Sequence, residues 1–134
     1  MIAVGWLLVL GVLTYAFSRW LDAERNPNRV VQSSNREGGV EVTLRQNRYG
    51  HYYVAGSING RAVEFIVDTG ATQIAVPAHL ADALQLRTGP PVLVSTANGN
   101  ATAYLTRIDE VRVGDIVVRD VKAHLNPGMK DDEI

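Results

Sequence analysis

The chain begins with an uninterrupted apolar run. Ile2 to Phe17 carries only two polar groups, one threonine and one tyrosine hydroxyl. Extended to Leu21, the run would cover about 30 Å as a helix, which is the thickness of the hydrocarbon core of a bilayer. We therefore predict a transmembrane anchor over residues 1–21. A cleaved signal peptide is the alternative, but it requires a positively charged start and no such charge precedes Arg19.

The residues after this run are polar and lack sustained apolar periodicity. Residues 22–39 are rich in Asn, Ser, Gly and charge, so we predict a flexible linker there. Arg19, Arg25 and Arg29 all follow the apolar run. By the positive-inside rule these charges place the following domain in the cytoplasm.

From Val40 onward apolar and polar residues alternate. Val40, Val42 and Leu44 share one face, which is typical of a half-buried strand. The same pattern predicts strands over residues 51–58 and 61–67. Between these two strands Asn59-Gly60 supplies the positive-φ pair of a tight hairpin.

The second half of the chain continues as short elements separated by turns. Turns about every ten residues indicate a mainly β domain over residues 40–134. At about 95 residues such a domain is small, so oligomerisation would help it to bury enough surface. The predicted elements are a strand over 72–76, a brief helix over Pro77–Leu86, strands over 92–97 and 100–113 around a turn at Asn98-Gly99, and a strand over 116–125 after Gly114-Asp115.

Composition narrows the chemistry that the domain can perform. The formal net charge is −1 and no basic cluster is present, which argues against a nucleic-acid partner. The absence of cysteine excludes thiol nucleophiles and disulfides. His51, His79 and His124 are spread over unrelated segments without metal-ligand spacing, so no metal site is expected.

The most informative stretch is the one in which an apolar strand, starting at Phe65, leads directly into Asp68, Thr69 and Gly70. An ionisable group at the end of a buried strand is costly unless it is hydrogen-bonded or functional. Gly70 lets backbone amides approach the Asp68 carboxylate, and the Thr69 hydroxyl can bond neighbouring backbone. The same tripeptide also occurs as a plain strand-to-turn junction, because Asp and Gly are common in turns.

In its context this stretch resembles the retropepsin-like family of aspartic proteases, the single-lobed relatives of retroviral proteases. The resemblance rests on Asp-Thr-Gly-Ala at residues 68–71, the apolar strand before it and Thr72 after it. It implies a closed β-barrel in which Asp68 is catalytic, and Thr69, Gly70 and Ala71 shape its loop. The hairpin thirty residues further on corresponds to the substrate flap of the family, with Ala97, Asn98, Gly99 and Asn100 at its tip.

Peptide hydrolysis of this type requires two carboxylates that share one proton. Asp68 is the only aspartate in the chain followed by Thr/Ser-Gly. We therefore predict a homodimer in which two copies of Asp68 meet on a twofold axis and activate a water between them. Anchoring both copies in one membrane raises their effective concentration. The resemblance implies the same dimer, with the Thr69 hydroxyls bracing the two loops.

The leading prediction is therefore a membrane-anchored, homodimeric aspartic endopeptidase. Its expected partners are a second copy, a peptide or protein substrate, and membrane lipid, without metal or organic cofactor. The expected localisation is a single-pass membrane protein, in the bacterial inner membrane by resemblance to bacterial members of the family. The resemblance implies a periplasmic domain and the charge count a cytoplasmic one, so the side stays open.

One departure from the family concerns the C-terminus. Retropepsin-like chains carry an apolar-apolar-Gly run there, behind the acid loop, of which Ile134 could be only the first residue. We therefore expect the protease domain to be C-terminally incomplete, with the core behind Asp68 unfilled. The alternative function is a non-catalytic β domain on a membrane stalk, which binds a peptide or protein along its strand edges. A third interpretation is an unrelated barrel in which Asp68-Thr69-Gly70 is only a turn.

Overall fold

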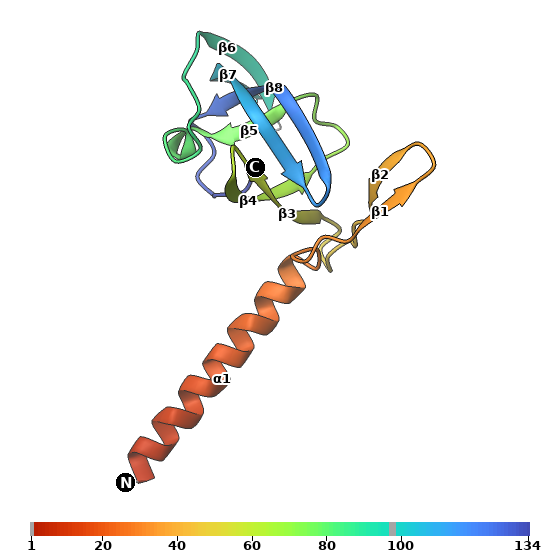
Figure 1. The fold of residues 1–134 in the computed structure, drawn as a ribbon. Helices are drawn as coiled ribbons and strands as arrows, with labels where there is room; N and C mark the ends of the chain where they lie inside the picture. Colours follow the sequence, from red (N-terminus) through yellow and green to blue (C-terminus); the bar gives the residue numbers. More distant parts are fainter. Residues whose placement is uncertain (1, 97–98) are drawn as a thin grey trace.

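The computed structural model describes residues 2–96 and 99–134, and in it a single helix stands clear of a β domain (Figure 1). Helix α1 spans Ile2–Arg25 and so continues for one turn past the apolar run. Its side chains are exposed over residues 3–21. The helix ends directly before Asn26-Pro27, because a residue that precedes proline is disfavoured in the helical conformation. By length and composition α1 could cross a membrane.

Two buried asparagines attach the end of α1 to the β domain. Asn26 and Asn28 are only 2% and 5% exposed. The Asn26 side-chain amide donates to Glu64 Oε1 at 2.6 Å. The Asn28 amide donates to the carbonyl oxygens of Arg45 and Tyr53 at 2.8 and 2.6 Å, and its Oδ1 accepts from the Arg45 backbone amide at 2.7 Å. The helix therefore leaves the domain in a direction fixed by hydrogen bonds.

Residues 22–39, expected to be a flexible linker, contain further ordered structure. Strand β1 (Ser33–Arg36) pairs antiparallel with β2 (Gly39–Val42). Ser33 Oγ accepts a hydrogen bond from the Asp115 backbone amide at 2.9 Å, which holds this hairpin against a turn of the main domain. The structure differs from the expectation because isolated contacts hold this segment, such as the Ser33 hydrogen bond and the packing of Val31 against the core, and isolated contacts leave no sustained apolar periodicity in the sequence.

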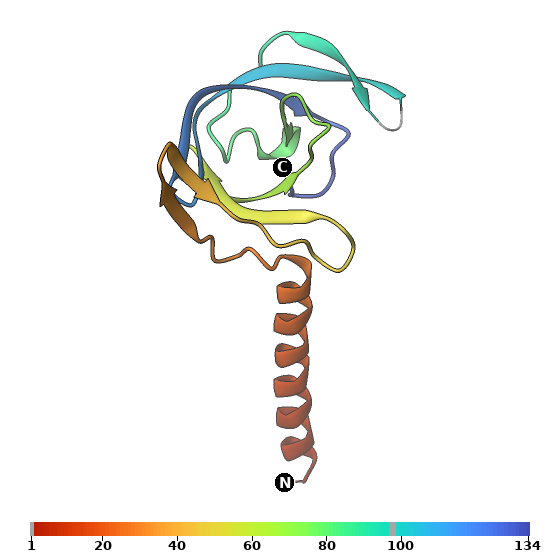
Figure 2. The ribbon, with the colours of Figure 1, turned by 90° about the vertical axis from the view of Figure 1, so that its right-hand side faces the viewer.

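Six strands form the main sheet, in the order β4-β3-β7-β8-β5, with β6 paired to β7. Neighbouring strands are antiparallel except for β5 and β8, which are parallel. The sheet curls around one core (Figure 2), and within the described residues its end strands β4 and β5 do not pair with each other. The mainly β fold is thus confirmed. The strands are β3 (Tyr52–Ile58), β4 (Arg61–Val67), β5 (Ile74–Pro77), β6 (Pro91–Thr96), β7 (Gly99–Val113) and β8 (Ile116–Asn126).

The β3–β4 hairpin has the turn that the sequence predicts. Asn59 and Gly60 have φ angles of 49° and 76°, which are the conformations of a two-residue hairpin turn. This turn fixes the register, so that Tyr52 lies opposite Val67 at the far end of the hairpin. The start of β3 and the end of β4 therefore lie side by side.

The helix predicted over Pro77–Leu86 is only partly formed. A 3₁₀ turn covers Ala78–Leu80, and a series of turns follows it. Gln85 has a positive φ of 58°, which cannot continue a right-handed helix. The chain bends there because Leu84 and Leu86, on either side of Gln85, are both buried in the core.

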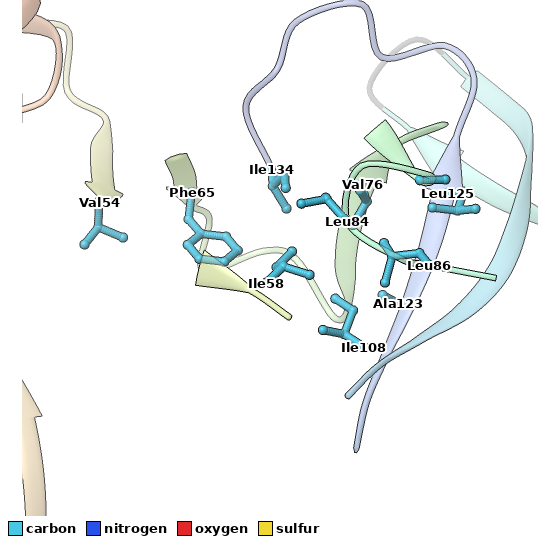
Figure 3. Packing of buried hydrophobic residues seen from close by; sticks show 11 residues of the cluster. Val54, Ile58, Phe65, Val76, Leu84, Leu86, Ile108, Ala123, Leu125 and Ile134 are labelled. Atoms are coloured by element: carbon cyan, nitrogen blue, oxygen red, sulfur yellow. The ribbon is translucent and has the colours of Figure 1, made fainter. Parts of the chain in front are cut away.

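One cluster of buried apolar side chains fills the inside of the curled sheet (Figure 3). Ile134 belongs to this cluster and is 8% exposed. Its backbone amide donates to the Glu64 carbonyl oxygen at 3.0 Å, and its carbonyl oxygen accepts from the Ile66 amide at 2.7 Å. Ile134 thus lies beside β4 and packs into the core. The buried members are Val54, Ile58, Phe65, Val76, Ala81, Leu84, Leu86, Ile108, Ala123, Leu125 and Ile134.

Candidate active site

Asp68 directly follows β4 and begins an exposed loop that leads to β5. Its Oδ1 accepts a hydrogen bond from the Gly70 amide at 2.8 Å, and its carbonyl oxygen accepts from the Ala71 amide at 3.2 Å. A Cβ atom on residue 70 would lie 3.3 Å from Asp68 Oδ1, so glycine permits this close approach. Thr69 and Ala71 are exposed in the same loop. The backbone therefore holds one carboxylate oxygen, and no described group bonds Oδ2.

A surface cavity of about 470 Å³ opens beside Asp68. This volume is in the range of small-molecule and peptide sites. Asp68 is the only acidic residue among the described residues that line the cavity, so one chain supplies one carboxylate to it. The lining residues are Gly50, His51 and Tyr52 at the start of β3, and Ile66, Val67, Asp68 and Thr69 at the end of β4.

The end of β4 is exposed although its residues are apolar. Ile66 and Val67 are 39% and 45% exposed, and the loop that follows them is exposed as well. Apolar surface next to a polar group is typical of surfaces that another protein or a ligand covers. In a single chain, Asp68 therefore lies next to exposed apolar surface of the kind that a ligand or a second protein covers.

The predicted flap lies at the tip of the β6–β7 hairpin, and it is described only in part. Ala97 and Asn98 lie outside the described residues. Gly99 has a φ of 104° and begins β7, where Asn100 pairs with Ser95. Neither Gly99 nor Asn100 lines the cavity beside Asp68. Of the predicted site residues, Asp68 and Thr69 line the cavity, whereas Gly70, Ala71 and the described part of the hairpin do not.

Sequence reasoning did not single out Gly50, His51 and Tyr52 as site residues. The signal that could have found them is the Asn59-Gly60 turn, since its register places Tyr52 opposite Val67. Residues just before Tyr52 must then lie next to those just after Val67. The loop that carries Gly50 is held by hydrogen bonds of the Gln46 and Asn47 side chains.

The groups whose pKa is shifted lie on β7 and β8, and none of them lines this cavity. Hydrogen bonds from Arg119 and Arg112 lower the pKa of Glu110. A hydrogen bond from Arg107 lowers the pKa of Asp120, and burial lowers the pKa of His124. The described residues include no group of three His, Cys, Asp or Glu side chains that could hold a metal ion.

A mainly β domain with a curled sheet, in which an Asp-Thr-Gly-Ala loop directly follows the edge strand β4, defines an aspartic-protease-like fold. The comparisons with known proteins agree with this class. Residues 54–134 match the family model of the gag-polyprotein putative aspartyl protease. This match covers more than half of the chain, and the protein therefore belongs to this retropepsin-like family.

Two proteins similar to this chain were found, and the first supports the assignment. The crystal structure of a retropepsin-like aspartic protease from Rickettsia conorii is similar with a TM-score of 0.53 and 29% identity, over 68% of this chain and 80% of that one. An uncharacterised protein encoded in the cobV 5′ region of Sinorhizobium sp. is 30% identical over 132 residues, which is 88% of this chain. The chain spans 56% of the length of that relative.

Proposed function

We propose that this protein is a membrane-anchored aspartic endopeptidase that acts as a homodimer. The observation that carries the proposal is the Asp68 loop, in which a backbone amide holds one carboxylate oxygen beside an open cavity. Membership of a retropepsin-like family supports the same reaction class.

We infer a dimer because one chain supplies fewer carboxylates to the cavity than the mechanism requires. Hydrolysis of a peptide bond by this mechanism requires two carboxylates that share a proton, and the described cavity offers only Asp68. A second copy related by a twofold axis supplies the other one. The exposed apolar side chains of Ile66 and Val67 would be covered in the same step.

In the proposed mechanism one Asp68 takes a proton from a water, and the other, protonated, donates a hydrogen bond to the scissile carbonyl oxygen. The two carboxyl groups titrate as a pair, so their pKa values belong to the dimer. Thr69, Gly70 and Ala71 keep each loop in shape. Gly99 and Asn100 of the β6–β7 hairpin belong to the proposed flap over the substrate, whose other members, Ala97 and Asn98, lie outside the described residues.

Helix α1 anchors each copy in this proposal. Its length and apolar composition suit a membrane span, and its exposed side chains find no protein partner in a single chain. Two copies held in one bilayer meet at a high effective concentration, which favours a small interface.

The test is cleavage of fluorescently labelled casein by the full chain in detergent micelles. Replacing the catalytic carboxylate in Asp68→Asn should lower the rate by roughly 10³-fold, since acid–base catalysis of this kind contributes that much. The matched control is Asp109→Asn, because Asp109 is exposed on β7 and lacks the Thr-Gly context. The control should cleave at the wild-type rate.

Substantial cleavage by Asp68→Asn, or an equal loss in both variants, would contradict the assignment. If the wild type binds casein peptides without cleaving them, the alternative function applies, a peptide-binding β domain on a membrane stalk.

A further inference from the structure

The loop between β2 and β3 lies beside the end of α1, where the helix meets the domain. The Asn47 side-chain amide donates to the carbonyl oxygen of Arg25, the last residue of α1, at 3.0 Å. Asn47 Oδ1 accepts from the backbone amides of Tyr49 and His51, both at 3.0 Å. One buried side chain thus shapes this loop and ties it to the helix. In Figure 2 the loop bends next to the upper end of α1.

The position of the loop along the helix sets its depth relative to a bilayer. The apolar run ends at Leu21, and Arg25 is one helical turn further along. Four residues of helix rise about 6 Å. The headgroup layer on each side of the hydrocarbon core is about 5–7 Å thick. With the apolar run in the core, a loop bonded to Arg25 therefore lies at the level of the headgroups.

The tip of the loop carries side chains that suit this level. Tyr49 is 64% exposed, and the Arg48 guanidinium carbon lies 4.7 Å from the centroid of its ring. Arg48 also donates a hydrogen bond to the Tyr49 hydroxyl. Tyrosine and arginine place an apolar body against lipid and a polar end in water, which favours them at membrane interfaces.

The charge of Arg48 is available to an outside partner. Arg25 pairs with Glu133, and Arg29 pairs with Asp22 at 3.4 Å. Arg48 has no carboxylate partner in the described part of the chain. An unpaired cation beside a membrane helix is attracted by anionic lipid.

We propose that the tip of this loop, Arg48 and Tyr49, is a second membrane contact that binds the headgroups of anionic lipids. The inference rests on the membrane anchoring proposed above. Gly50 and His51 of the same loop line the cavity beside Asp68. The lipid contact therefore orients the domain with this wall of the site close to the membrane surface.

The experiment uses the absence of cysteine in the chain, which allows one fluorophore per molecule. Full-length Leu10→Cys, Tyr49→Cys and Ser95→Cys are labelled with bimane and reconstituted in phosphatidylcholine–phosphatidylglycerol vesicles. Nitroxide lipids labelled on the headgroup or on the acyl chain quench the fluorophore where they touch it. Ser95 is exposed on β6 and serves as the control, because β6 lies at the end of the β domain that is far from α1 (Figure 2).

We expect headgroup nitroxide to quench the label at position 49 several-fold more than the label at 95, and acyl-chain nitroxide to quench the label at 10. Quenching at 10 with equal quenching at 49 and 95 overturns the loop contact and leaves the anchor intact. No quenching at 10 overturns the anchor and the loop contact together.

Lipid charge is tested with the same label at position 49. Replacing phosphatidylglycerol by phosphatidylcholine, or adding Arg48→Gln, should lower the headgroup quenching several-fold while the label at 10 is unchanged. Quenching that depends neither on lipid charge nor on Arg48 would overturn the recognition of anionic headgroups.

Discussion

Asp68 and Asn28 are both polar, but Asp68 is exposed and Asn28 is buried. Asp68 lies on an exposed loop with one carboxylate oxygen bonded to the Gly70 amide. Asn28 is buried, and its amide group makes three hydrogen bonds to the backbone of Arg45 and Tyr53. An exposed, partly bonded carboxylate is free to react, whereas a buried, fully bonded amide fixes structure.

Asn28→Ala should lower the free energy of unfolding by about 3 kcal/mol, since it removes three partly buried hydrogen bonds worth about 1 kcal/mol each. The measurement is urea denaturation of the full chain in detergent, followed by the β-sheet signal in circular dichroism. Asn35→Ala is the control, because Asn35 is exposed on β1. A loss no larger than that of the control would show that the bonds at Asn28 do not hold the helix junction.

The sequence predicts Asp68 and its loop because their signal is local, an acid followed by a hydroxyl and a glycine at the end of an apolar strand. It does not predict the burial of Asn26, Asn28 and Asn47. Each of them bonds at least one partner that is 17 or more residues away along the chain, and asparagines in a polar stretch look like those of a linker. Polar burial depends on tertiary partners, which a pattern of residue types does not contain.

At the scale of elements, the β3–β4 hairpin positions the site. Its turn sets the register that brings Tyr52 opposite Val67, and β3 then continues along β7 through Ser57 and Ile58. The sequence predicts this hairpin because alternation and the Asn59-Gly60 turn are local. The parallel pairing of β5 with β8 joins segments about fifty residues apart and has no such local signal.

The crossing of β3 with β7 depends on Gly56. A Cβ atom there would lie 2.5 Å from the carbonyl oxygen of Arg112 and 2.7 Å from the ring of Phe65. Gly56→Ala should therefore lower the free energy of unfolding by about 1–3 kcal/mol, because the strands or the ring must shift. The measurement is the same urea titration, with Ser57→Ala on the same strand as control. A Gly56→Ala protein as stable as the control would contradict the close packing at this crossing.

At the scale of the whole molecule, helix α1 carries exposed apolar side chains, and the cavity beside Asp68 is lined by a single carboxylate among the described residues. Both features leave exposed apolar surface. In the proposed function, lipid would cover the helix and a second copy of the chain would cover the end of β4. The hydrogen bonds of Asn26, Asn28 and Asn47 join these two parts. In the proposed function, this junction would connect the membrane anchor to the dimeric site.

The most direct test of the proposed dimeric site is the stoichiometry of a pepstatin-type inhibitor, which requires paired carboxylates. Native mass spectrometry of the full chain released from detergent micelles counts inhibitors and chains in one complex. The proposed dimeric site should bind one inhibitor per two chains, and Asp68→Asn should bind none. One inhibitor per single chain, or binding that survives Asp68→Asn, would contradict it.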